Sequence, residues 1–254
     1  MNMSLWKAKL RASTLHICIS LLVATIIGII VFFVWYPSPF GFAGGGLKLF
    51  LLVSIIDLIL GPVLTFVVFN PLKKRSLMLL DFSVIAALQL SALVYGVSVV
   101  YVGRPVAVVF EGNRFRVVRA SDVAEKELMK AKDGFRELSM SGPKLLGTRP
   151  VTDAEQSETL DRAMKGEDIG MRPEFWVDYK ECQERAKLEL RSIDILLKRF
   201  PDQKSELDAI ASRAGVRTEQ LGFLPAIANT SMFSILIRKD DGSFVGYILL
   251  DGTG

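Results

Sequence analysis

The residues that could carry out chemistry in this chain are few, and several lie in apolar surroundings. The only histidine, His16, is in a long apolar segment, and so are Cys18 and Asp57. A lone histidine in such a place argues against a histidine-based catalytic triad and against most zinc sites. The chain also has no glycine-rich phosphate loop and no Cys-x-x-Cys motif. We therefore predict no metal, no cofactor and no enzymatic activity.

One acid pair deserves a test as an intramembrane aspartyl-protease dyad, namely Asp57 and Asp81. The two carboxyls of such a dyad share a proton, so they must lie about 3 Å apart. Asp57 lies 12 residues before Phe69, which is roughly 18 Å of helix, whereas Asp81 lies at the mouth of the next apolar segment. The Gly-x-Gly-Asp pattern of that protease class is also absent. We therefore predict no catalytic residues.

Three apolar segments must position these side chains. They cover about residues 15–35, 47–69 and 82–102, and each has roughly the 20 apolar residues that cross a bilayer core. The first is too long for a signal peptide and lacks a good cleavage site after it, so we expect an uncleaved anchor. The predicted fold class is a three-helix transmembrane bundle in residues 1–102 followed by a soluble α+β domain in residues 103–254.

The charge distribution predicts the orientation of this bundle. Of 31 Lys and Arg residues, seven lie in residues 1–102 with two acids, which leaves 24 bases and 25 acids in the remainder. Basic residues precede span one and also lie in the loop between spans two and three. The positive-inside rule therefore places the N-terminus in the cytoplasm and the C-terminal domain outside. The soluble part has no excess of positive charge, and we predict no nucleic-acid binding.

Each span carries a stripe of small or polar residues at helical spacing. Such stripes let helices approach closely, so they predict either internal packing of the bundle or a docking face for a helix of another protein. The stripes contain His16, Ser20, Ala24 and Gly28 in span one, Ser54, Asp57, Gly61 and Thr65 with the helix-loosening Pro62 in span two, and Gln89, Ala92 and Gly96 in span three.

Asp57 is the most informative residue, because it lies midway along span two. A carboxylate at that depth costs about 3 kcal/mol even on lenient insertion scales, so it needs a partner or water. Gln89 in span three is at a similar depth and is the expected partner, whereas His16 lies near the cytoplasmic end and is expected to be too far away. Two interpretations remain open: a protonated Asp57 hydrogen-bonded inside the bundle, or recognition of a polar group on a partner helix.

The soluble half predicts an α+β domain with a hairpin at each end. Alternation and turn residues predict strands at 104–110, 114–118, 144–148, 233–238 and 244–250. Capping residues and periodicity predict helices at 121–132, 152–165, 173–199 and 203–214. The helix at 173–199 is expected to be the longest, because three- and four-residue steps connect Trp176, Tyr179, Gln183, Ala186, Leu190 and Ile193, an apolar seam that only Gln183 interrupts.

Four stretches resemble the TfpX/TfpZ family of type IV pilin accessory proteins. They are Trp35-Tyr-Pro-x-Pro39, Asp57 to Thr65 with Val68 to Lys74, Asp81 to Leu90 with Tyr95-Gly96, and Arg104 to Phe110. The resemblance is specific up to about residue 120. It implies a multi-pass protein of the bacterial inner membrane with a periplasmic C-terminal domain. It also implies a non-enzymatic, chaperone-like role in the stability or assembly of a specific major type IV pilin.

The resemblance implies that the partners are the major pilin, membrane lipids and the pilus assembly machinery, and it leaves the oligomeric state open. The resemblance implies that the following residues match positions of the family's pattern: Asp57, Gly61, Pro62, Asn70, Pro71, Asp81, Gln89, Arg104 and Pro105. The residues expected to bind a partner are therefore the span stripes without His16, together with Pro62, Arg104 and Pro105. The alternative function is a membrane-anchored periplasmic sensor or regulatory binding protein that acts through a membrane partner.

Overall fold

The chain divides into two compact units in a computed structural model that describes residues 3–43, 45–229 and 231–253. The helical unit comprises Met1–Val34 and Gly46–Val102. The sheet domain comprises Trp35–Gly45 and Gly103–Gly254. The chain therefore enters the sheet domain twice, once between two long helices and once after the third.

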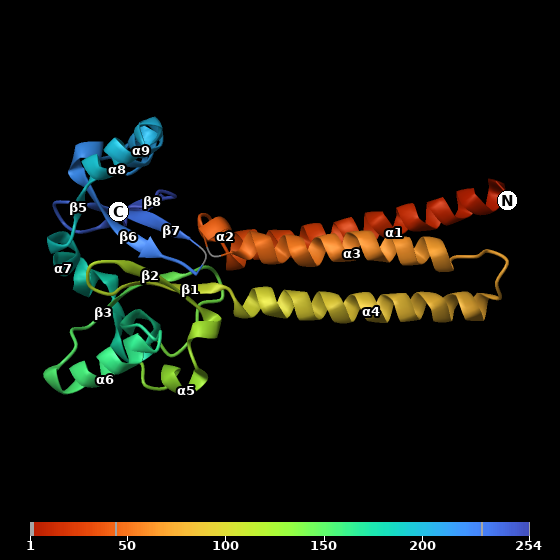
Figure 1. Cartoon of the computed structure of the whole chain (residues 1–254), viewed down its shortest axis with the longest axis horizontal. Coiled ribbons are helices and arrows are strands. Elements are labelled where there is room, and N and C mark those ends of the chain that lie inside the picture. Colours follow the sequence, from red (N-terminus) through yellow and green to blue (C-terminus); the bar gives the residue numbers. More distant parts are fainter. Residues whose placement is uncertain (1–2, 44, 230, 254) are drawn as a thin grey trace. The chain divides into compact units, whose positions relative to one another are not determined.

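The helical unit consists of three long apolar helices (Figure 1). They are α1 (Met3–Ile29), which continues as a π-helical segment at Ile30–Trp35, α3 (Gly46–Val68) and α4 (Arg75–Val102). By length and composition, all three can cross a membrane. The predicted apolar spans are confirmed as helices, although α1 and α4 begin earlier, within the basic flanks.

The sheet domain is built on an eight-stranded mixed sheet with the strand order β4-β3-β1-β2-β6-β7-β8, and β5 pairs beside β2 on the same edge of β6. Two pairs, β1–β3 and β2–β6, are parallel and the others are antiparallel. The strands are β1 (Pro105–Phe110), β2 (Phe115–Arg119), β3 (Lys144–Thr148), β4 (Trp176–Asp178), β5 (Arg191–Ser192), β6 (Leu221–Ile227), β7 (Met232–Arg238) and β8 (Phe244–Ile248).

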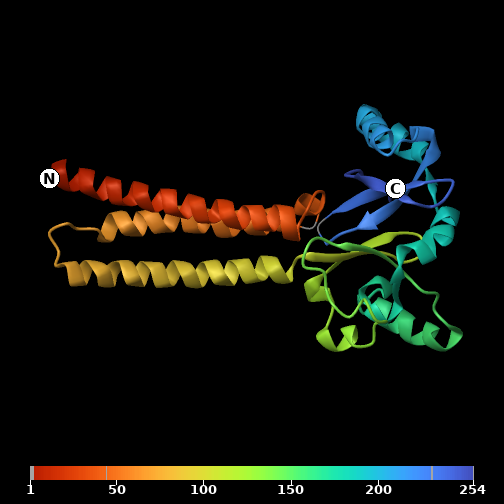
Figure 2. The ribbon, with the colours of Figure 1, turned by 180° about the vertical axis from the view of Figure 1, so that it is seen from behind.

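Apolar side chains cover both faces of this sheet. One face carries a cluster around Phe110, Phe115 and Phe233, and the other carries clusters around Trp176 and around Phe223. In Figures 1 and 2, α8 and α9 gather beside β6 to β8, whereas α5 and α6 lie beyond β3. The helices of the domain are α5 (Glu125–Leu128), α6 (Asp153–Met164), α7 (Gln183–Leu188), α8 (Ile193–Arg199) and α9 (Lys204–Arg213).

The segment Trp35–Gly45, which joins α1 to α3, packs into the sheet domain and contains the short helix α2 (Phe40–Ala43). Phe40 is only 2% exposed, and its ring meets Phe233 and Tyr247 edge-on at centroid distances of 6.2 and 5.3 Å. Tyr36 is also buried, and this burial raises its pKa to about 12. The sequence analysis placed the domain boundary at residue 102 and did not assign this loop to the soluble domain.

The predicted long helix at 173–199 is wrong. The segment folds instead as β4, α7, β5 and α8 with short 3-10 turns between them. Asp178 and Ser192 accept hydrogen bonds from the backbone N–H groups two residues later, so each starts a new turn. Pairing of Trp176–Asp178 with β3 then competes with helix formation and prevails.

Most other predicted elements are confirmed. Both hairpins, the strand at 144–148 and the helices near 152–165 and 203–214 are present as β1–β2, β7–β8, β3, α6 and α9. The helix predicted at 121–132 shrinks to α5, because the Asp122 carboxylate accepts bonds from Arg119 instead of capping a helix that follows it. Strand β6, which lies between β2 and β7, was missed.

Candidate functional site

Helix α3 organises the helical unit, because it packs against both α1 and α4. Glycines permit this close packing. A Cβ atom on Gly28 of α1 would lie 3.1 Å from the Phe50 ring of α3, and one on Gly96 of α4 would lie 2.5 Å from both methyl groups of Val53. Two of the small residues in the predicted stripes therefore form helix–helix contacts inside this unit.

A polar cluster lies at the middle of α3, where its neighbours supply side chains from both sides. The Gln89 amide of α4 donates a 2.9 Å hydrogen bond to Asp57 Oδ1. The predicted pairing of these two residues is therefore confirmed. Asp57 is half-buried. This degree of burial fits a polar group in an apolar helical unit that borders a groove.

His16 joins the same cluster from α1. Its Nδ1 atom lies 2.7 Å from the Thr65 hydroxyl, and a Cβ atom on Gly61 would lie 2.7 Å from its Nε2 atom. The same added Cβ atom would collide with the Gln89 amide nitrogen. Gly61 is thus the place where α1, α3 and α4 bring polar side chains together, one turn from Asp57. His16 does not pair with Asp57, as expected, but its place in the cluster was not anticipated.

Two further contacts fasten α1 to the end of α3. Ser13 donates a 3.0 Å hydrogen bond to the carbonyl of Pro62, and Lys9 donates a 3.2 Å bond to the carbonyl of Val67. Helix α3 runs through Pro62 as one helix. Buried Pro62 therefore serves the contact with α1.

Two grooves open beside the Asp57–Gln89 pair. The first has a volume of about 260 Å³ and lies between α1 and α4, where His16, Ser20, Ala86 and Leu93 also line it. The second has a volume of about 450 Å³, lies between α3 and α4, and is lined almost entirely by apolar side chains, Ala92 among them. Asp57 and Gln89 line both grooves, whereas His16 and Ser20 line only the first, which therefore receives polar side chains from three helices.

The remaining predicted partner-binding residues lie in different places. Ala24 and Ser54 line the narrow space enclosed by the three helices. Arg104 and Pro105 belong to the sheet domain, where Pro105 begins β1 and the Arg104 guanidinium donates to the Ser139 carbonyl at 3.3 Å. Arg104 is buried. It is therefore a structural residue of the domain, separate from the cluster around Asp57.

The second acid of the helical unit, Asp81, has a partner of its own. It forms a 2.7 Å ion pair with Lys73 from the connection between α3 and α4. Asp57 and Asp81 thus have different partners.

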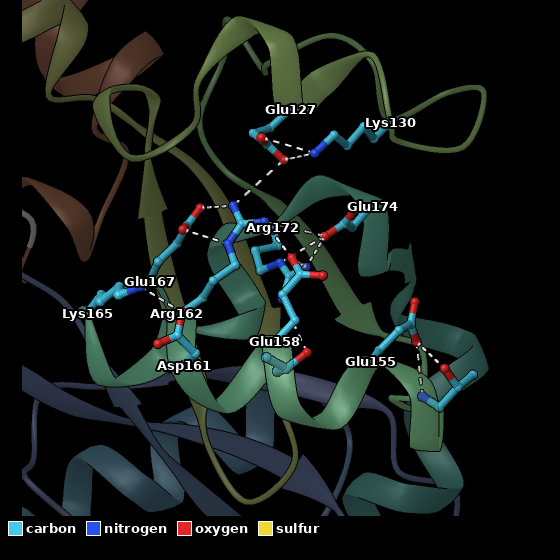
Figure 3. A network of polar contacts seen from close by, with 12 residues as sticks. Glu127, Lys130, Glu155, Glu158, Asp161, Arg162, Lys165, Glu167, Arg172 and Glu174 are labelled. Carbon is cyan, nitrogen blue, oxygen red and sulfur yellow. Dashed lines mark hydrogen bonds and ion pairs between the residues drawn. The ribbon is translucent and has the colours of Figure 1, made fainter.

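The sheet domain holds an ion-pair network on α6 and its neighbours (Figure 3). Arg172 is 3% exposed and donates to Glu158, Glu174 and the Thr159 hydroxyl. Arg162 donates a 2.5 Å hydrogen bond to Glu167. It also lies within 4.0 Å of the carboxylates of Glu127, Glu158 and Glu174. The network contains no nucleophile, and we interpret it as a clamp that fixes α6 to the sheet domain.

These ion pairs change the titration of the acids. Hydrogen bonds from Arg149 and from Thr152 hold the pKa of Glu155 far below its ordinary value. The Arg162 guanidinium lowers the pKa of Glu167 in the same way. Both carboxylates are therefore charged across the neutral range.

The cysteines form no disulfide, as expected. Cys18 is exposed on α1, whereas Cys182 is buried in the sheet domain. Burial raises the pKa of the Cys182 thiol, and the nearby Arg185 only partly offsets this effect. A raised pKa keeps the thiol protonated and unreactive. Among the described residues, no group of three or more His, Cys, Asp or Glu side chains could hold a metal ion.

Comparison with known proteins identifies relatives of this chain by sequence. The fimbrial assembly protein FimB family matches residues 4–45, which cover α1 and the loop after it. Two fimbrial assembly proteins of Dichelobacter nodosus, from serogroups I and E1, are each 36% identical over 233 residues, or 91% of this chain and 91% of the relative. No solved structure matches.

A third relative covers less of the chain. The Dichelobacter nodosus fimbrial assembly protein of serogroups C1 and C2 is 44% identical over 121 residues, which are 48% of this chain and 92% of that protein. The two longer matches span nearly the whole of this chain and of each relative. The chain belongs to the fimbrial assembly protein family.

Proposed function

We propose that this chain is a non-enzymatic accessory protein of the bacterial inner membrane that supports the stability or assembly of a specific major type IV pilin. The observation that carries the proposal is the 91% coverage of relatives named fimbrial assembly proteins. The resemblance of four sequence stretches to TfpX/TfpZ accessory proteins makes the proposal specific for type IV pilins. The relatives differ in serogroup, which supports a protein matched to a surface antigen that differs between strains.

The division of the chain supports a three-span topology. The loop Trp35–Gly45 follows one apolar helix and Gly103–Gly254 follows three, yet both belong to one compact domain. Two segments of one domain must lie on the same side of a membrane, and an odd number of crossings before each satisfies this requirement. The positive-inside rule then favours the periplasm for that side, since Lys7, Lys9 and Arg11 precede α1.

The open helical unit supports a holding role rather than catalysis. Its polar cluster contains an imidazole, an amide and one carboxylate, but it lacks a second carboxylate for proton sharing. The grooves beside it suit contact with another apolar helix. A pilin waiting in the membrane has such a helix and carries a globular head outside, so it could meet both units.

The test is deletion of the gene in its own bacterium, followed by measurement of the half-life of the major pilin, its transcript and surface pili. The proposal predicts a half-life shortened at least about threefold, loss of pili and an unchanged transcript, with recovery on complementation. A sensor, the alternative function, would instead change the transcript. Pilin that keeps its normal half-life while pili still assemble would refute the accessory role.

A further inference from the structure

The groove between α1 and α4 differs from ordinary lipid-facing surface in the chemistry of its floor. His16 and Ser20 come from α1, Asp57 from α3 and Gln89 from α4, so all three helices contribute polar atoms. The wall is made of small and aliphatic residues such as Ala86 and Leu93. A lipid acyl chain could cover this wall, but it offers no hydrogen bond to the floor.

The floor has hydrogen-bonding capacity left over. Gln89 satisfies one oxygen of the Asp57 carboxylate, and no donor to the other oxygen exists among the described residues. The same holds for the side-chain oxygen of Gln89. Acceptors at mid-depth of an apolar unit are costly unless a donor reaches them. No lysine or arginine lines the groove, so no basic side chain of the groove competes with an incoming donor.

We propose that the α1/α4 groove binds a single apolar helix of the partner that carries an N–H or O–H donor midway along its span, and that this donor bonds the Asp57 carboxylate. The proposal rests on the proposed function, which makes the partner the major pilin. The larger α3/α4 groove also reaches Asp57 and Gln89, but apart from Tyr95 the rest of its lining is apolar and suits acyl chains, and α1 contributes no polar side chain to it. Lipid therefore fills that groove, and the partner helix occupies the polar one.

The first experiment places a photoreactive amino acid at three exposed positions of the full chain in cells that make the cognate pilin. Ala86 lies in the α1/α4 groove, Ala92 lies in the α3/α4 groove, and Ile59 lines neither groove and serves as the lipid-facing control. We expect pilin adducts at Ala86 that exceed those at Ala92 and Ile59 at least about fivefold. Equal adducts at all three positions, or adducts mainly at Ala92, would overturn the proposal.

The second experiment tests the donor. The double variant Asp57→Leu/Gln89→Leu replaces both partners of the internal hydrogen bond, which leaves no unpaired group and should preserve insertion. We expect the Ala86 adduct to fall about fivefold, which corresponds to ~1 kcal/mol. Thr25→Val is the matched control, because the Thr25 hydroxyl bonds only its own helix at 2.7 Å and should leave the adduct unchanged.

The outcomes separate this inference from the proposed function. If the double variant does not accumulate, Asp57→Asn keeps the shape and the Gln89 contact, and we expect at least a twofold loss of adduct. An adduct that survives loss of the carboxylate would overturn the recognition by Asp57. Gene deletion that shortens the pilin half-life, combined with no adduct at Ala86, would reject the groove alone. Deletion without any effect on pilin would reject the proposed function itself.

Discussion

At the scale of single residues, Gly61 determines whether the polar cluster can exist. A side chain there would occupy the space where the His16 ring and the Gln89 amide approach each other. The glycine therefore does more than allow close helix packing. It sets how near α1 and α4 come to each other above α3, and so how the floor of the groove is arranged.

Gly61→Ala should lower the free energy of unfolding of the helical unit by about 1–3 kcal/mol, the usual cost of overpacking. The measurement is denaturation of the purified protein in detergent micelles. Gly28→Ala is the matched control with a smaller expected loss, because its added methyl group meets only the Phe50 ring, which can shift. Equal losses for the two variants would show that the cluster at Gly61 has no special role.

Some of the residue-level picture could be predicted from sequence. The pairing of Asp57 with Gln89 follows from their equal depth in neighbouring spans, because a buried carboxylate requires a donor. The contact of His16 with Thr65 agrees with the predicted depth, because both residues lie toward the same end of the bundle. Depth alone did not single out this contact, because it does not determine which faces of α1 and α3 meet.

At the scale of elements, the loop with α2 acts as part of the sheet domain. Phe40 inserts an aromatic ring between Phe233 of β7 and Tyr247 of β8. In the sequence this loop is a short uncharged stretch between two apolar segments, and aromatic residues at such a place are also typical of a membrane interface. Burial of Phe40 shows that they belong to a core instead.

Phe40→Ala should destabilise the sheet domain by about 3–5 kcal/mol, as expected for a buried phenylalanine. Limited trypsin digestion of the full chain in detergent measures this effect as faster cleavage between β6 and β8. Leu188→Ala removes a side chain that is 85% exposed and should leave the rate unchanged. A Phe40 variant with wild-type resistance to trypsin would mean that the loop is dispensable for the domain.

The segment 173–199, which was predicted as one helix, shows that helical periodicity alone does not determine secondary structure. Its apolar residues follow helical spacing, yet Trp176 and Tyr179 contact the sheet at different places from Ile193. Short capping side chains divide the segment, and pairing with β3 fixes the first part as a strand. Local spacing indicated which side chains are apolar and regularly placed, but long-range pairing decided which secondary structure they form.

At the scale of the whole molecule, charge is concentrated outside the apolar helices and much of it is paired. The network around Arg162 and Arg172 joins α6 to the turns that precede β4 (Figure 3). The sequence shows many bases and acids in this region, but not which of them meet. The sequence also predicted two regions of the chain, but not that the loop Trp35–Gly45 belongs to the sheet domain.

The sheet domain should lose stability in acid. The pKa of Glu167 is lower in the folded state than its ordinary value of 4.5, so its charge stabilises the fold above that pH and this contribution disappears as the pH falls below it. Glu167→Gln should therefore reduce stability at pH 7 by less than about 1 kcal/mol, since the pair is partly solvent-exposed. The difference between the variant and the wild type should therefore be smaller at pH 3 than at pH 7.

Unfolding by urea, followed at both pH values, measures this difference. Glu189→Gln is the matched control, because Glu189 is exposed and has no ion-pair partner among the described residues. A difference for Glu167→Gln that persists unchanged at pH 3 would mean that the amide perturbs packing, and that the charge of Glu167 is not responsible.

The position of Phe40 in the core has a consequence for biosynthesis. Its partners Phe233 and Tyr247 are synthesised about 190 residues later, which is roughly 10–40 s at ~5–20 residues per second on the ribosome. During that interval the Phe40 ring has neither of these two aromatic partners. A chain cut short before β7 cannot bury the ring against them, so closure of this part of the core must follow synthesis of β7 and β8.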